Sequence, residues 1–308
     1  MALSTRLKEA LNRGLRPLNL GLRTLTAEQA ELARLKGLEA RGYFDEPAFP
    51  VPDSVRDSDH TAVVELLKLY RDEIARLASP ETNDVGYRLD NIFYGSPDAE
   101  VLYCLVRDLA PRRIVEVGSG NSTRIMRQAI IDGGLDAEVV CIDPQPRVEV
   151  ESVADRVIRK RLEDLEIDAF AEIASGDMVF FDSSHRVDTG NDVVRFFLSV
   201  LPALPAGAVV HVHDVFLPYE YPREWVIDQR WGWGEQYVLQ AYLQAATDVE
   251  VLWAGHHVQR SRSDFDDWFP QRTGRAQSLW LRTGPRVGSA IASARQADGV
   301  ETSKVFAT

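Results

Sequence analysis

Residues 112–123, which read RRIVEVGSGNST, constrain the fold of this chain more than any other stretch. The mostly β-branched residues at 114–117 are typical of a buried parallel strand. Gly118 and Gly120 follow at once, and a helix is predicted over residues 124–131. A strand, a glycine turn and a helix in this order let a ligand approach bare backbone at the carboxyl edge of a sheet, because no Cβ fills the ligand's space.

Two acidic residues narrow the choice of ligand. Glu116 stands at the end of the first predicted strand. A second strand, predicted over 138–142, is followed by Asp143, 23 residues after Gly120, where an acid typically binds the ribose hydroxyls of an adenosine ligand. The third glycine of a dinucleotide fingerprint is missing, since Thr123 stands there. A carboxylate at Glu116 suits an ammonium group better than a pyrophosphate, which favours S-adenosylmethionine over NAD(P).

The motif VEVGSGNST followed by CIDP resembles the cofactor-binding half of the class I S-adenosylmethionine-dependent methyltransferases. The resemblance covers about residues 85–255 and implies a doubly wound α/β fold with a mostly parallel, seven-stranded sheet. It also implies the cofactor site: the methionine end on Glu116, Gly118, Ser119, Gly120, Asn121 and Ser122, the ribose on Asp143, and further contacts from Pro144, Glu163 and Asp182. A dinucleotide-dependent oxidoreductase remains an alternative.

The remaining strands are predicted from the spacing of apolar runs between helical segments. The third, fourth and fifth are expected at 156–159, 178–181 and 208–212, and a closing antiparallel pair at 249–253 and 278–282. The expected organisation is a helical extension over residues 1–80, a methyltransferase domain over 81–283 with an insertion at 254–277, and a tail over 284–308.

Polar side chains follow the fourth and fifth predicted strands. Asp182 and His185 come after the fourth, and His213 and Asp214 after the fifth. Because parallel strands present their carboxyl ends at one edge, these groups are expected to converge. They resemble the site of metal-dependent sugar O-methyltransferases, in which Asp182 and Asp214 match metal ligands and His185 matches the base. An acid usually stands where His213 is, and imidazole suits manganese, iron or zinc better than magnesium.

The resulting hypothesis is methyl transfer to a hydroxyl of a small molecule, such as a sugar or natural product. Asp182, His213 and Asp214 are the predicted metal ligands, and His185, with Asp182 and His213, forms the predicted catalytic group. A metal-independent N-methyltransferase and a non-catalytic binding protein are the alternatives. His211, deeper in the fifth strand, is interpreted as a hydrogen-bonded core residue.

Composition limits the partners and the compartment. The net charge is −12 and the pI is near 5.0, which argues against nucleic acid as a partner. Cys104 and Cys141 lie among apolar neighbours, which fits a reducing cytoplasm better than a disulfide framework. No apolar run reaches the ~20 residues that a membrane span requires.

Two further segments of the sequence each allow more than one interpretation. Residues 1–25 are basic and can form an amphipathic helix that binds a membrane surface or a partner. Alternatively the helix packs on its own domain, or the segment is a frayed terminus. Residues 216–237 hold seven aromatic side chains and follow the predicted site directly. They can form an acceptor pocket or lid. Alternatively they form a plug of the core, or a subunit interface, which would make the chain a homo-oligomer.

Overall fold

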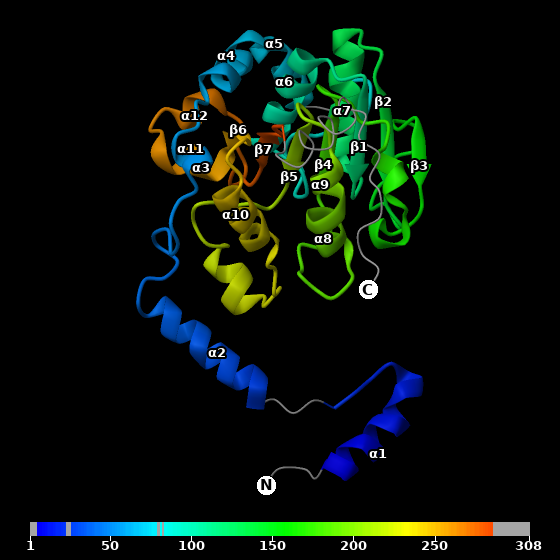
Figure 1. Cartoon of the computed structure of the whole chain (residues 1–308), viewed down its shortest axis with the longest axis vertical. Coiled ribbons are helices and arrows are strands. Elements are labelled where there is room, and N and C mark those ends of the chain that lie inside the picture. Colours follow the sequence, from blue (N-terminus) through cyan, green and yellow to red (C-terminus); the bar gives the residue numbers. More distant parts are fainter. Residues whose placement is uncertain (1–4, 23–25, 79–80, 82, 286–308) are drawn as a thin grey trace, which may run out of the picture. The chain divides into compact units, whose positions relative to one another are not determined.

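The computed structural model describes residues 5–22, 26–78, 81 and 83–285 (Figure 1). The chain divides into two compact units. One comprises residues up to 46 together with 222–231, and the other comprises residues 47–221 and those from 232 onward. The predicted domain boundary at residue 80 stays a prediction, and the predicted tail lies outside the described residues from residue 286.

A seven-stranded sheet forms the centre of the larger unit, in the order β3-β2-β1-β4-β5-β7-β6 (Figure 1). Strand β7 runs antiparallel to both of its neighbours, and the other pairings are parallel. This confirms the predicted doubly wound α/β fold and its antiparallel closing pair. The strands are β1 (Arg113–Val117), β2 (Glu138–Ile142), β3 (Arg156–Ile158), β4 (Met178–Phe181), β5 (Val209–Val212), β6 (Glu250–Ala254) and β7 (Leu279–Arg282).

Helices cover both faces of this sheet because side chains alternate along each strand. Ile114 and Val139 belong to an apolar cluster with α6 and α7, whereas Val115 and Val140 belong to one with α8 and α10. In the larger unit the α-helices are α3 (Asp53–Arg56), α4 (Thr61–Leu69), α5 (Arg71–Ala75), α6 (Asp98–Leu109), α7 (Asn121–Gly133), α8 (Asp192–Arg195), α9 (Leu201–Ala203), α10 (Glu235–Ala245), α11 (Gly255–Ser261) and α12 (Phe265–Trp268).

The smaller unit contains the helices α1 (Thr5–Leu15) and α2 (Thr26–Glu39). The hydrogen bond from Arg223 Nε to Glu39 Oε1, at 2.5 Å, ties α2 to the segment 222–231. The helix that the sequence predicts within the basic residues 1–25 is present as α1. None of the helices in the described part of the chain has the length and apolar character that a membrane span needs.

Glu100, in the first turn of α6, makes the stability of the fold depend on pH. Its side chain is buried, and Ser96 Oγ donates a hydrogen bond to one carboxyl oxygen. Burial raises the pKa of Glu100 from 4.5 to about 7. The folded protein therefore binds this proton more tightly than the unfolded chain does. The resulting stability is fully present below the unfolded pKa and is lost as the pH rises through 7.

We expect Glu100→Gln to remove this loss, because the amide keeps the shape of the side chain and cannot ionise. The variant should unfold with nearly the wild-type free energy at pH 5 and be more stable at pH 8, by up to about 3 kcal/mol. Urea unfolding at the two pH values measures the difference. A difference between the two proteins that does not change with pH would contradict it.

Candidate functional site

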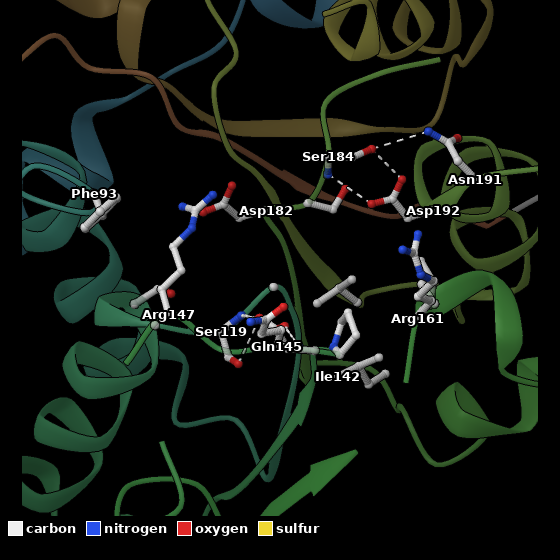
Figure 2. A pocket seen from close by; sticks show the side chains of 18 of the residues that line it. Phe93, Ser119, Ile142, Gln145, Arg147, Arg161, Asp182, Ser184, Asn191 and Asp192 are labelled. Carbon is white, nitrogen blue, oxygen red and sulfur yellow. Dashed lines mark hydrogen bonds between the residues drawn. The ribbon is translucent and has the colours of Figure 1, made fainter. Parts of the chain in front are cut away.

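A cavity of about 410 Å³ lies at the carboxyl ends of β1, β2 and β4 (Figure 2). Figure 2 shows Ser119 and Gln145 on one side of it and Ser184, Asn191 and Asp192 on another. Nine of the ten residues predicted to bind the cofactor line this cavity: Gly118, Ser119, Gly120, Asn121, Ser122, Asp143, Pro144, Glu163 and Asp182. The tenth, Glu116, does not.

The two glycines of the turn have different physical roles. Gly118 has φ +80°, and a Cβ built on it would lie 1.7 Å from the backbone oxygen of Asp182. Gly120 has an extended φ of 176°, and a Cβ there would meet no atom within 4 Å. Gly118 is thus required by close packing of the β1 and β4 ends, whereas Gly120 leaves open space in the cavity.

Glu116 braces the turn from beneath, which corrects the expectation that it faces the ligand. It shares a strand face with Ile114, on the side of α7, because side chains alternate along β1. Ser122 Oγ and Thr123 Oγ1 each donate a hydrogen bond of 2.5 Å to its carboxyl group. The side chain is fully buried, and burial raises the pKa of Glu116 to about 7. Glu116 therefore does not face a ligand in the cavity and gives no preference for a cationic one.

Asp143 stands where the sequence places the ribose-binding acid. Its Oδ2 accepts a hydrogen bond from the Ser119 backbone N–H at 2.8 Å, and its Oδ1 accepts one from the Gln145 N–H at 2.7 Å. These bonds hold the carboxylate at the cavity wall between the ends of β1 and β2. Ser119 Oγ also donates to Oδ2, at 3.3 Å, so Oδ1 is the oxygen that keeps a lone pair for a ligand hydroxyl.

Three carboxyl groups surround His185. Its Nε2 lies 3.2 Å from Asp182 Oδ1 and 3.2 Å from Asp214 Oδ2, and its Nδ1 lies 2.9 Å from Glu235 Oε2. Burial disfavours a charged imidazole, but the surrounding carboxylates outweigh it and hold the pKa of His185 well above its ordinary value. Both nitrogens therefore have an acceptor for a proton.

The backbone is strained where it presents these groups. His185 has φ +59° and Asp214 has φ +54°, a left-handed conformation that residues other than glycine seldom adopt. Strain of this kind is found at functional sites, where the surrounding structure enforces it. Here it directs one side chain from the loop after β4 and one from the loop after β5 toward each other.

Glu235 is the site residue that sequence reasoning missed. It begins α10, is buried, and the N–H groups of Gly234 and Glu235 both donate to the backbone oxygen of His185, at 2.9 and 3.2 Å. Its sequence signal is an acid at a helix start, which ordinarily serves only the helix dipole. The adjacent Trp233 ring lies 4.2 Å from the His185 ring, centroid to centroid.

The donor set suits a divalent cation. Asp182, His185 and Asp214 each offer one ligand atom, and these atoms lie within 4.8 Å of one another. Burial opposes ionisation of Asp182, but the nearby imidazoles outweigh it and lower its pKa to about 2, so a charged carboxylate is available. His213 Nε2 lies 3.9 Å from Asp214 Oδ1, just outside this group.

His211 is a buried residue as predicted, but its predicted hydrogen bond is wrong. The imidazole stacks on Phe180 with a centroid distance of 3.9 Å, and in the described part of the chain neither ring nitrogen has a hydrogen-bond partner. Stacking in an aromatic layer with Trp280, 4.7 Å away, replaces the polar contact.

Residues 115–215 match the family model of a methyltransferase domain. This match covers the glycine turn, Asp143 and the ends of β4 and β5. With the strand order and the cavity at the strand ends, it identifies a methyltransferase domain in this part of the chain.

Several solved structures are similar to the chain at low identity. The SAH-bound Podospora anserina methyltransferase PaMTH1 is 17% identical with a TM-score of 0.40, and the match covers 87% of this chain and 100% of that one. The O-methyltransferase from Bacillus cereus in complex with SAH is 16% identical with a TM-score of 0.37, over 72% and 90%. MycE from the mycinamycin biosynthetic pathway, with Mg and SAH, is 13% identical with a TM-score of 0.38, over 75% and 56%.

No curated protein matches the chain.

Proposed function

We propose that this enzyme transfers the methyl group of S-adenosylmethionine to a hydroxyl of a small molecule, such as a sugar or natural product, with His185 as the general base. The observation that carries the proposal is the group formed by Asp182, His185 and Asp214. Asp182 also lines the cofactor cavity, so the group borders the place where the methyl donor would lie.

The reaction needs a base at this border. In an in-line displacement, the acceptor oxygen forms a bond to the methyl carbon while the carbon–sulfur bond breaks, and the hydroxyl proton must leave. We assign that proton to Nε2 of the neutral His185 ring, whose orientation Glu235 fixes at Nδ1. A cation held by Asp182 and Asp214 would offset the two carboxylates that otherwise keep this imidazole protonated. The surrounding carboxylates then stabilise the imidazolium that forms.

Asp182 and Asp214 would hold a divalent cation, which supplies positive charge that lowers the pKa of a hydroxyl acceptor. The two carboxylates come from neighbouring strand ends, so they can fix such a charge beside His185. Trp233 supports a ring-shaped acceptor, since its ring lies against His185 and aromatic faces stack well on sugar rings.

Two measurements test the proposal in sequence. S-adenosylhomocysteine, and not NAD(P), is expected to raise the melting temperature. Labelled S-adenosylmethionine incubated with a library of hydroxylated sugars and natural products should then yield an O-methylated product. An N-methylated product would overturn the acceptor assignment. A protein that binds neither S-adenosylmethionine nor its product would overturn the whole proposal.

We expect Glu235→Gln to lower kcat by at least about tenfold, which is part of the ~10²- to 10⁴-fold that a general base contributes. The amide can still accept a hydrogen bond from His185 Nδ1, but it no longer balances the imidazolium charge. The KM for S-adenosylmethionine should stay near the wild-type value, because Glu235 does not line the cofactor cavity.

Glu100→Gln is the matched control for this variant. It is the same substitution at a buried glutamate whose pKa burial also raises to about 7, and it does not touch His185. Its kcat should equal that of the wild type. If both variants lose activity equally, or if neither does, the charge of Glu235 does not assist the base.

A further inference from the structure

We propose that His213 is a nitrogen ligand of the cation site and that it makes the site prefer transition ions such as Mn²⁺, Fe²⁺ or Zn²⁺ over Mg²⁺. This inference rests on the proposed function, because it concerns the cation that Asp182 and Asp214 would hold. It goes further by naming the ligand that selects the ion.

The first observation is an unsatisfied imidazole. His213 is 2% exposed, and among the described residues neither of its ring nitrogens has a hydrogen-bond partner. A buried polar group left unpaired costs about 1–3 kcal/mol. Tyr94 and His211 face the ring with their own rings, at centroid distances of 4.9 and 5.4 Å. A bound ion would satisfy a nitrogen that these neighbours leave unpaired.

The second observation is a distance. His213 Nε2 and Asp214 Oδ1 are 3.9 Å apart, which is too long for a hydrogen bond. Two bonds of about 2.1 Å to one ion span at most about 4.2 Å, so this separation lies within the reach of a shared ion. His185 Nε2, in contrast, lies at 3.2 Å from each aspartate oxygen.

The two histidines therefore take separate roles. Glu235 holds Nδ1 of His185, which orients that ring as the base, whereas no described residue hydrogen-bonds either nitrogen of His213. Carboxylate and water oxygens suit Mg²⁺, whereas an imidazole in the same site suits divalent ions of the first transition row. One imidazole beside two carboxylates shifts the preference toward ions that accept both donors.

Mn²⁺ is the probe, because its electron paramagnetic resonance reports binding without turnover. Titration of the full chain should show Mn²⁺ binding, and pulsed spectra of the bound ion should show the modulation of a directly coordinated imidazole nitrogen. In His213→Glu, that modulation should disappear, and Mg²⁺ should displace Mn²⁺ at a concentration at least about tenfold lower than in the wild type.

His211→Gln is the matched control, because it alters the neighbouring buried histidine on the same strand and should keep the modulation. Binding of S-adenosylhomocysteine checks that each variant folds. If His213→Glu does not fold, the wild type with isotopically labelled histidine still tests for imidazole coordination, and His213→Gln replaces the variant.

Three results would overturn the inference: no Mn²⁺ binding, no nitrogen modulation, or a modulation that is lost in His185→Ala and kept in His213→Glu. If the protein still methylates a hydroxyl in the presence of EDTA, the proposed function stands and only the ion assignment fails.

Discussion

Gly118→Ala is expected to destabilise the protein by roughly 3 kcal/mol or more and to abolish binding of S-adenosylhomocysteine. The added Cβ would lie 1.7 Å from the backbone oxygen of Asp182, so β1 and β4 would have to separate at the tip where the cavity begins. The residue also needs φ +80°, which alanine resists. Urea unfolding and calorimetry with S-adenosylhomocysteine measure the two effects.

Gly120→Ala separates the effect of a methyl group on ligand binding from its effect on the stability of the fold. A Cβ at Gly120 meets no atom of the chain within 4 Å, and its φ of 176° is open to any residue. This variant should keep nearly the wild-type stability and still bind the cofactor more weakly, because the methyl group projects into ligand space. If Gly118→Ala is as stable as Gly120→Ala, the packing of the turn against Asp182 is not what requires the glycine.

His185→Ala is expected to lower kcat by about 10²- to 10⁴-fold and to leave the affinity for S-adenosylhomocysteine close to that of the wild type. The imidazole is the group placed to accept the acceptor's proton, but it does not line the cofactor cavity. Single-turnover rates with labelled S-adenosylmethionine and binding calorimetry test the two halves of this expectation.

A histidine outside the proposed site supplies the control for this variant. His257 lies in α11 and is half-buried, and His257→Ala should leave both kcat and affinity unchanged. Added imidazole should restore part of the lost rate in His185→Ala, because the small base can enter the space that the side chain vacates. Full activity of His185→Ala with intact cofactor binding would remove His185 from the mechanism.

The roles of individual side chains were harder to predict than their positions. The sequence places Asp182, His185 and Asp214 at two strand ends, and the structure brings them together. Glu116 was assigned to the ligand because it adjoins the glycine turn, but the pleat turns it toward α7. Glu235 has no neighbour in the sequence that points to catalysis, since it meets His185 from 50 residues away.

The sheet, its glycine turn and the edge at which the site forms all follow from the amino-acid sequence. Apolar periodicity, glycines and strand ends are local features, which can be recognised in a short stretch of sequence. Which polar groups face the cavity and which support its wall emerges from the folded chain. That outcome depends on strand parity, on the left-handed backbone at His185 and Asp214, and on a helix that returns Glu235 to the base. Contacts between distant segments set these, and no local pattern encodes them.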